Sequence, residues 1–426
     1  MFDDNEIAQR ALDLMLNSNQ NIYLTGDAGT GKSTLLKEFV KQSPKKVIIL
    51  APTGMAAVNA GGETIHSFCK FGPIPGYQLL QQNKIVKLRD SKLIKSIETL
   101  VIDETSMVRS DMLDCLDRFF RVNTGKDHLP FGGIQVILFG DHFQLPPILK
   151  RDEQEMFSDL YNSEYFFDAR CFVELRLKYV KLTRNYRQSE ADFIKLLNYL
   201  RYGAYNIDLI QWINQKFHSE PRSNSGAITL TVFNQDALEI NSQRLERIKE
   251  NARVYKAEIK GSFKPEMFPT EENLGLKVGS QVMFVKNDPN KKYVNGTVGK
   301  ITSLGKDTIK VRISTKELEV ERVSWEVFHY EFDEEKGEIT RKTTGVFLQF
   351  PLKLAWAVTI HKSQGQTFDN CIINLGRGAF VTGQTYVAFS RCRKMEGITL
   401  SKPIKASDIK TDKRIFEFEK QSQWNK

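Results

Sequence analysis

The sequence has little cysteine and no long apolar run. Its five cysteines, spread over 426 residues, form no CxxC pair and no Cys/His cluster with the spacing of metal ligands. We therefore expect reduced, buried thiols rather than disulfides or a zinc site. No apolar run approaches the roughly 20 residues that a membrane-spanning helix needs. The acidic start of the chain lacks the basic and apolar segments of a signal peptide, so we expect a cytoplasmic protein with no membrane partner.

The composition is that of an ordinary globular protein. With 41% hydrophobic and 27% charged residues, the chain can bury proper cores, which excludes a disordered protein. Its length favours two or three domains, at about 150 residues each. Of the net charge of +9, most lies in residues 346–426, which hold thirteen Lys and Arg against six Asp and Glu. This surplus suits a polyanionic partner such as nucleic acid, although a solubilising tail would also produce it.

Short apolar runs predict the fold class. The runs NIYLTG, KVIILAPT, ETLVIDE and IQVILFGD alternate with helix-compatible segments, which is typical of a parallel sheet with helices on both faces. A second set, YVKLTRNYRQ, AITLTVFNQ, NCIINLG and GITLS, predicts a second α/β layer. The intervening segment TIKVRIS places Ile309, Val311 and Ile313 on one face, which favours a small antiparallel barrel.

These patterns predict an α/β protein with an inserted β domain. We expect a first domain at residues 1–175, with a small insertion at about 64–80. The second domain is expected to combine residues 176–250 and 346–426, with the β insert at 251–345. In parallel sheets ligands bind at the carboxyl ends of the strands, and we expect the functional residues there.

The segment GDAGTGKST matches the phosphate-binding pattern G-x-x-x-x-G-K-[ST]. It follows a predicted strand and opens a predicted helix, as a phosphate cradle requires. We expect main-chain N–H groups to face the phosphates of ATP, Lys32 to reach the β and γ oxygens, and Ser33 to ligate Mg²⁺. A glycine-rich turn without chemistry is the alternative. The nucleotide-binding residues expected here are Gly26, Asp27, Ala28, Gly29, Thr30, Gly31, Lys32, Ser33 and Thr34.

Further polar residues follow other strands. In LVIDETS we expect Asp103 to hold Mg²⁺ and Glu104 to activate the attacking water, although adjacent acids also occur in solvated turns. In FGDHFQLPP, Gln144 could sense the γ-phosphate. Arg187 and Arg391 are candidate arginine fingers on the second domain, which fits a nucleotide held between the two domains, although a single such arginine is usually a surface charge.

Seven ordered segments resemble superfamily 1 helicases, and more narrowly the petite-integration-frequency (PIF) family of 5′-to-3′ DNA helicases, relatives of RecD. They run from Gly26 to Arg393, over nearly the whole chain. The segments are GDAGTGKST, APTGMAAVNAGGETIHSF, LVIDETSM, LFGDHFQLPP, LTRNYRQ, AVTIHKSQGQTFD and GQTYVAFSRCR. The resemblance implies two RecA-like P-loop domains, an SH3-like insert at GLKVGSQVMFVKNDPNKKYVNGTVGKI, and a minimal helicase core.

The resemblance also implies residue roles. Gln9 corresponds to the position that reads adenine, and Gln364 and Gly365 to positions facing the γ-phosphate. Contacts to single-stranded DNA are implied for Thr53, Gly54, Thr64, His66, Phe68, His142, His361, Lys362 and Ser363.

The loop CKFGPIPGYQ is a candidate wedge for splitting a duplex. Phe71, Pro73, Ile74 and Pro75 combine apolar surface with backbone stiffness, because proline fixes φ. The family carries its wedge at this place. The alternative is a rigid surface loop whose Phe71 tucks into the core.

We predict a monomeric, ATP- and Mg²⁺-dependent 5′-to-3′ DNA helicase. It would act on single-stranded DNA and fork or duplex junctions, with G-quadruplex DNA or RNA–DNA hybrids as further substrates. The alternatives are a helicase acting on RNA or mixed substrates, and a nucleic-acid-binding ATPase that uses ATP as a conformational switch. A metabolic kinase is a weaker third option, because it would not need the paired arginines or TIHKSQGQT.

Overall fold

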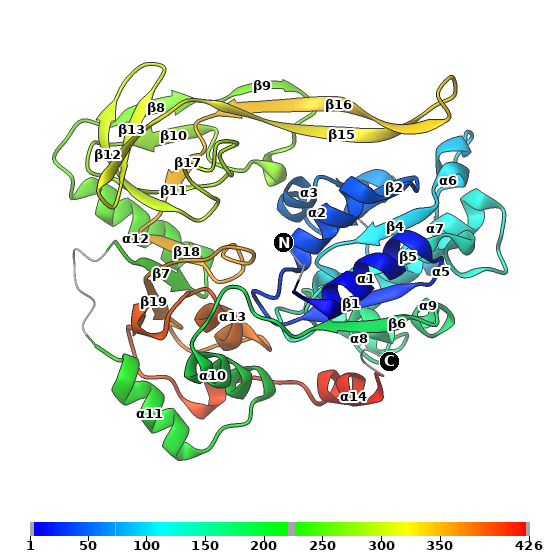
Figure 1. Cartoon of the computed structure of the whole chain (residues 1–426), viewed down its shortest axis with the longest axis horizontal. Helices are drawn as coiled ribbons and strands as arrows, with labels where there is room; N and C mark the ends of the chain where they lie inside the picture. The colour runs from blue at the N-terminus through cyan, green and yellow to red at the C-terminus, as the bar shows by residue number, and fades with distance from the viewer. Residues whose placement is uncertain (1–3, 73, 220–225, 423–426) are drawn as a thin grey trace. The chain divides into compact units, whose positions relative to one another are not determined.

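The computed structural model describes residues 4–72, 74–219 and 226–422. Contacts between residues divide the chain into two compact units (Figure 1). Unit 1 consists of Met1–Tyr186, Val327–Thr344 and Lys413–Lys426, and unit 2 consists of Arg187–Glu326 and Gly345–Asp412. This division differs from the expected domain limits, because the first unit also includes two late segments of the chain and residues 176–186, whose strand from YVKLTRNYRQ was expected in the second layer.

Unit 1 is built on one six-stranded parallel sheet with the order β3-β2-β4-β5-β1-β6. Its strands are β1 (Ile22–Gly26), β2 (Val47–Ala51), β3 (Glu63–Thr64), β4 (Thr99–Ile102), β5 (Gln135–Phe139) and β6 (Lys178–Leu182). Its helices are α1 (Glu6–Asn17), α2 (Lys32–Gln42), α3 (Gly54–Ala60), α4 (Ile65–Phe68), α5 (Gly76–Gln81), α6 (Lys92–Ser96), α7 (Ser110–Thr124), α8 (Gln154–Ser158), α9 (Arg170–Glu174) and α14 (Lys413–Gln421).

Alternate side chains of the central strands enter two hydrophobic cores, one on each face of the sheet. On β1, Ile22 and Leu24 belong to the core formed with α1 and α2, whereas Tyr23 belongs to the core formed with α7. On β4, Val101 joins the first core and Leu100 the second. Because side chains alternate along a strand, burying both faces requires a continuous apolar run, which is the pattern of these segments.

Two segments that come late in the sequence complete the α7 core of unit 1. The first is the tip of the hairpin formed by β15 (Val323–Asp333) and β16 (Glu338–Gln349), which Figure 1 shows as two long adjacent strands. Its Tyr330 is 6% exposed, and its hydroxyl accepts a hydrogen bond from the Ile49 N–H at 3.0 Å. The second is α14, whose Phe418 ring stacks on Phe167 with centroids 4.4 Å apart. Unit 1 therefore draws its core from three separate parts of the chain.

Unit 2 combines a parallel α/β layer with antiparallel strands. The parallel sheet has the order β18-β7-β19-β20, from β7 (Ile228–Thr231), β18 (Ala357–Thr359), β19 (Cys371–Asn374) and β20 (Ile398–Leu400). Its helices are α10 (Ala191–Tyr202), α11 (Ile207–Phe217), α12 (Asn234–Glu246) and α13 (Gln384–Ser390). The other strands are β8 (Arg253–Lys256), β9 (Glu258–Gly261), β10 (Asn273–Leu276), β11 (Gln281–Phe284), β12 (Val298–Leu304), β13 (Ile309–Ile313), β14 (Lys316–Val320) and β17 (Leu352–Leu354).

The antiparallel strands enclose a core of their own. The five-stranded sheet has the order β14-β13-β12-β11-β17, and the expected face of Ile309 and Val311 is fully buried in this core. The predicted α/β class is therefore confirmed, whereas the antiparallel strands β16 and β17 extend beyond the expected limit of the insert at residue 345. All five cysteines are buried and free. Within the described residues, no helix has both the length and the hydropathy needed to cross a membrane.

Candidate functional site: a phosphate-binding loop and its neighbours

The loop between β1 and α2 has the structural setting that phosphate binding requires. Gly29 and Gly31 have φ angles of 89° and 88°, in the left-handed region that favours glycine. No side chain of a described residue caps α2, so its first N–H groups can face an anion. Lys32 Nζ donates hydrogen bonds to the carbonyl oxygens of Gly26 at 2.7 Å and Asp27 at 3.1 Å. Its ammonium group therefore lies across the loop.

The acid pair lies at the carboxyl end of β4. The N–H of Asp103 donates to the carbonyl of Leu50 at 2.9 Å, which fixes its position just beyond the strand. Burial, and then the charge of Glu104, raises the pKa of Asp103, while Lys32 and Lys37 oppose this rise. Glu104 has a φ of 50°, a left-handed conformation that is uncommon for a residue with a side chain. A half-buried acid pair on a strained backbone near Lys32 is typical of a catalytic site.

The loop after β5 lies against the same acidic segment. A Cβ atom added to Gly140 would lie 3.2 Å from the main-chain nitrogens of Thr105 and Ser106, a tight contact, so glycine lets the two segments approach closely. Gln144, four residues after Gly140, is 8% exposed, and its side-chain amide donates to Asp141 Oδ2 at 3.2 Å. The carboxyl ends of β1, β4 and β5 therefore carry the residues expected to act on the nucleotide. Gln9 lies exposed on α1, and Ser33 lies in the first turn of α2.

The segment after β6 supports the phosphate-binding loop, a role that the sequence did not reveal. The Tyr186 N–H donates to the Gly29 carbonyl at 2.9 Å, and the Asn185 side chain donates to the Ala28 carbonyl at 3.2 Å. Both residues belong to LTRNYRQ, from which sequence reasoning selected only Arg187. An asparagine three residues after the end of β6, between Arg184 and Arg187, was the available signal.

The two candidate arginine fingers lie together in unit 2. Burial, and then the charge of Arg391, lowers the pKa of Arg187 to about 9, and Arg187 Nη1 donates to the Ser390 carbonyl at 3.2 Å. Arg391 is 1% exposed and donates from Nε to the Val387 carbonyl at 3.0 Å. Its Nη1 also donates to the Ser363 carbonyl at 3.3 Å. Arg391 therefore braces the TIHKSQGQT segment, which sequence reasoning did not anticipate.

The TIHKSQGQT segment turns tightly after β18. The Ser363 N–H donates to the last carbonyl of β18 at 3.0 Å, and the Gln364 N–H donates to the His361 carbonyl at 3.2 Å. Gly365 adopts a φ of 75°. Lys362 and Gly365 are exposed, and His361 and Gln364 are half-buried. Burial lowers the pKa of His361. This turn presents main-chain and side-chain groups to solvent on unit 2.

Two of the residues expected to contact DNA in unit 1 are threonines that cap short helices. Thr53 caps α3, accepting the Ala56 N–H at 3.2 Å, and Thr64 caps α4 in the same way. Gly54 is the first residue of α3. Thr53 and His66 are exposed. These side chains and helix N-termini can meet a phosphate backbone.

Phe68 and Phe71 are core residues, which corrects their expected roles in DNA contact and in the wedge. Each is 8% exposed, and each ring centroid lies 6.1 Å from a phenylalanine ring of α7. Truncating such buried rings costs about 3 to 5 kcal/mol, so their contribution is to stability. Of the other wedge residues, Pro73 lies outside the described residues, and Ile74 and Pro75 are half-buried.

Ser363 and His142 are also buried, which corrects their expected contacts with DNA. Ser363 is 0% exposed, and its Oγ donates to the Ile360 carbonyl at 2.7 Å. His142 is 2% exposed; its Nδ1 shares a hydrogen bond with the Tyr23 hydroxyl at 2.9 Å, and its Nε2 shares one with Glu419 of α14 at 2.6 Å. Both side chains are covered by the protein and form hydrogen bonds within it, so neither is exposed for a contact with DNA.

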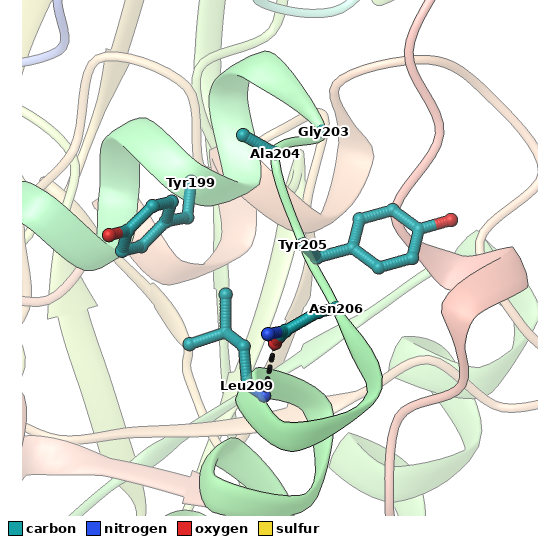
Figure 2. Close-up of a pocket in the computed structure, with 6 residues that line it drawn as sticks. All are labelled: Tyr199, Gly203, Ala204, Tyr205, Asn206 and Leu209. Carbon is teal, nitrogen blue, oxygen red and sulfur yellow. Dashed lines mark hydrogen bonds between the residues drawn. The ribbon is translucent and has the colours of Figure 1, made fainter.

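A pocket of about 360 Å³ lies between the end of α10 and the start of α11 in unit 2 (Figure 2). It is lined by Tyr199, Gly203, Ala204, Tyr205, Asn206 and Leu209. The Asn206 side chain accepts the Leu209 N–H at 2.8 Å and so caps α11. None of the expected site residues lines this pocket, so it gives no support to a catalytic role.

Comparisons with known proteins show which family this chain is similar to. A family model described as PIF1-like helicase matches residues 3–209, and one described as the 2B domain of the DNA helicase Pif1 matches residues 258–304. The chain is 32% identical to the ATP-dependent DNA helicase Pif1 of Bdellovibrio bacteriovorus, over 96% of this chain and 90% of that protein. It spans about three fifths of the length of the vertebrate PIF1 helicases that it matches.

Solved structures show the same similarity. The Pif1 of Bacteroides sp in complex with ADP-AlF4 is 38% identical, with a TM-score of 0.90, over 98% of this chain and 96% of that one. The Bacteroides Pif1 bound to ssDNA has the same identity and coverage and a TM-score of 0.69.

Proposed function

The chain belongs to the PIF1-like helicase family, and from this premise we propose that it is an ATP-dependent DNA helicase that moves 5′ to 3′ on single-stranded DNA. The observation that carries the proposal is the grouping of Lys32, Asp103 and Gln144 at the carboxyl edge of one parallel sheet. A strained acid next to a phosphate-binding loop is suited to hydrolysing a nucleotide rather than to storing it.

Each of several residues of unit 1 has its own role in ATP hydrolysis. The loop N–H groups and Lys32 bind the phosphates, Glu104 accepts the proton of the attacking water, and Gln144 senses the γ-phosphate. Ser33 and Asp103 would hold Mg²⁺. Hydroxyl and carboxylate oxygens are ligands that this ion prefers, and a dication would favour the ionised form of the buried Asp103. When bound, Mg²⁺ neutralises charge on the phosphates.

The proposal also assigns roles in ATP hydrolysis to residues of unit 2. Arg187 and Arg391 supply positive charge to the transition state, and Gln364 and Gly365 respond to the γ-phosphate. The support is that both arginines are held among main-chain carbonyls, with Arg391 bonded to the segment that contains Gln364. Hydrolysis can therefore change the conformation of that segment, which is how ATP turnover would drive stepping.

The DNA-binding residues that fit this proposal are exposed or half-buried polar groups. They are Thr53, Gly54, Thr64, His66, His361 and Lys362. Contacts to the phosphate backbone carry no sequence information, so we expect little sequence preference. The substrates include fork and duplex junctions, with G-quadruplex DNA and RNA–DNA hybrids as further candidates. We also propose that the protein acts as a monomer at the nucleoid in the cytoplasm.

The wedge proposal now rests on Ile74 and Pro75, because Phe71 is buried. Replacing Ile74 and Pro75 with Ser and Gly should reduce duplex separation while DNA-stimulated ATPase and translocation on single strands persist. Ile74 and Pro75 can be changed while the buried ring of Phe71 stays in the core. Full retention of unwinding would place the wedge elsewhere.

One strand-separation assay tests the function. Duplex DNA with a single-stranded 5′ tail should be unwound with ATP, and the same duplex with a 3′ tail should not. Lys32→Ala is the inactive control. Unwinding only from 3′ tails, or none from either, would contradict the proposal. An RNA tail tests the mixed-substrate alternative, and ATPase stimulation by DNA without unwinding would indicate the conformational switch.

A further inference from the structure

Two exposed phenylalanines stack on one another in unit 2. The rings of Phe233 and Phe380 are 5.4 Å apart between centroids and nearly parallel, with an interplanar angle of 4°. Phe233 is 46% exposed and Phe380 is 52% exposed. Most large apolar side chains of this chain are buried, so a stacked pair left in contact with water is unusual here.

Hydrogen bonds fix the main chain from which both rings project. The Phe380 N–H donates to the side chain of Gln384 on α13 at 3.0 Å, and the preceding Ala379 N–H donates to Asp408 at 3.1 Å. The Phe233 carbonyl accepts the Thr231 hydroxyl at 3.1 Å. With its main chain anchored and its rings stacked on one another, the pair forms a platform. A fixed aromatic surface loses little conformational entropy when it binds a flat partner.

Strand register brings this platform to the proposed DNA-binding turn. Thr231 at the end of β7 pairs with Thr359 of β18, and the Ile360 N–H donates to the Thr231 carbonyl at 2.8 Å. Phe233 and His361 each follow the end of their strand by two residues. They therefore leave the same edge of the sheet on adjacent strands.

A cation lies at the same edge. Lys362 directly follows His361 in the turn after β18, and it is exposed. Within the described part of the chain Lys362 forms no ion pair with a carboxylate. An exposed positive charge without an acidic partner favours a bound anion such as a phosphate of the DNA backbone.

We propose that Phe233 and Phe380 form a stacking site for a base of single-stranded DNA whose backbone lies along Lys362. The site deepens the helicase function proposed above and rests on it. A base stacks on an aromatic face regardless of its sequence, whereas a phosphate binds the neighbouring lysine, so a single strand satisfies both features at once. An apolar peptide would satisfy the rings but not the cation.

The test compares two oligonucleotides of equal charge. One is a dT oligomer of about 12 nucleotides, within the usual site size, and the other carries abasic sugars in place of its central bases. Phe380→Ala, alone and with Phe233→Ala, should weaken binding of the dT oligomer roughly five- to 150-fold, the range for losing one stacked base. Binding of the abasic oligomer should not change. Phe380→Trp should restore the tighter binding of the dT oligomer relative to the abasic oligomer.

Controls separate this site from folding and from the function as a whole. Trp212→Ala removes another exposed aromatic side chain, 40% exposed on α11, and should bind both oligomers as the unsubstituted chain does. Equal weakening of both oligomers by Phe380→Ala, or no weakening of either, would overturn the stacking site. If the unsubstituted chain binds no single strands and unwinds nothing, the helicase function itself fails. If it does both while the phenylalanine variants behave identically to it, only the stacking site fails.

Discussion

Glu419 on α14 offers a quantitative test of how the C-terminal helix is held in unit 1. Its carboxylate bonds to His142 at 2.6 Å and also to Lys181. Burial alone would raise the pKa of Glu419, but the hydrogen bonds and charges of these two partners outweigh it and lower the pKa to about 2. We therefore expect Glu419→Gln to loosen α14 while leaving its apolar contacts in place.

The size of the effect follows from the pKa. A fall from the ordinary value of 4.5 to about 2 corresponds to about 3 kcal/mol in favour of the docked helix, at about 1.4 kcal/mol per tenfold change. The side chain is 14% exposed, so solvent screening is limited. Because the pKa is lowered on docking, this stabilisation is present above pH 4.5 and is lost as the pH falls towards 2.

Hydrogen exchange of the α14 amides measures this local opening directly, whereas a global denaturation midpoint of a two-unit chain would not. Glu419→Gln should speed exchange roughly 10²-fold at pH 7. The difference from the unsubstituted chain should shrink below pH 4.5. Glu417→Gln, at an exposed position of the same helix, is the matched control. Identical exchange in both chains at pH 7, or a difference that persists at low pH, would refute the reasoning.

Three further predictions concern activity. Glu104→Gln should lower DNA-stimulated ATP turnover by roughly 10² to 10⁴-fold and leave ATP binding nearly intact, because it removes the base but keeps its size; turnover at the unsubstituted rate would exclude the role. Arg187→Ala or Arg391→Ala should lower turnover by roughly 10³ to 10⁵-fold, far more than either lowers ATP affinity. Arg391→Lys should not restore the rate of ATP turnover, because an ammonium lacks the guanidinium fork. Unchanged rates in both alanine variants would contradict the assignment. His66→Ala and His361→Ala should weaken DNA binding without changing ATP affinity in its absence. The affinity of the unsubstituted chain should fall with salt at a slope of about −0.7 per contacted phosphate, and a flat response between low and moderate salt would contradict backbone binding.

The sequence predicted the strands, the phosphate-binding loop and the acid pair because each is encoded locally. A parallel strand buried on both faces needs a continuous apolar run, and the loop between Gly26 and Lys32 needs its glycines whatever surrounds it. These patterns lie within about ten residues of chain and do not depend on distant partners. The roles of these residues in catalysis remain predictions that the proposed variants test.

The buried aromatic and polar residues could not be placed in this way. Phe68 and His142 stand in segments that match DNA-contacting motifs, but each side chain is covered by residues hundreds of positions later, Tyr330 and Glu419. Burial of this kind is a property of tertiary contacts, and a linear pattern contains no record of them. The same holds for Asn185, whose partner is a carbonyl 157 positions earlier in the chain.

The tip of the β15–β16 hairpin and α14 give unit 1 an unusual order of synthesis. A ribosome releases residues 1–186 long before Tyr330, and Phe418 emerges later still, although both rings close the same core. Domains generally fold as they leave the ribosome, but this one must wait with part of its aromatic surface uncovered. The nascent chain therefore presents a chaperone-binding surface until Phe418 has emerged. An expressed fragment ending at residue 186 would keep that surface permanently and should aggregate.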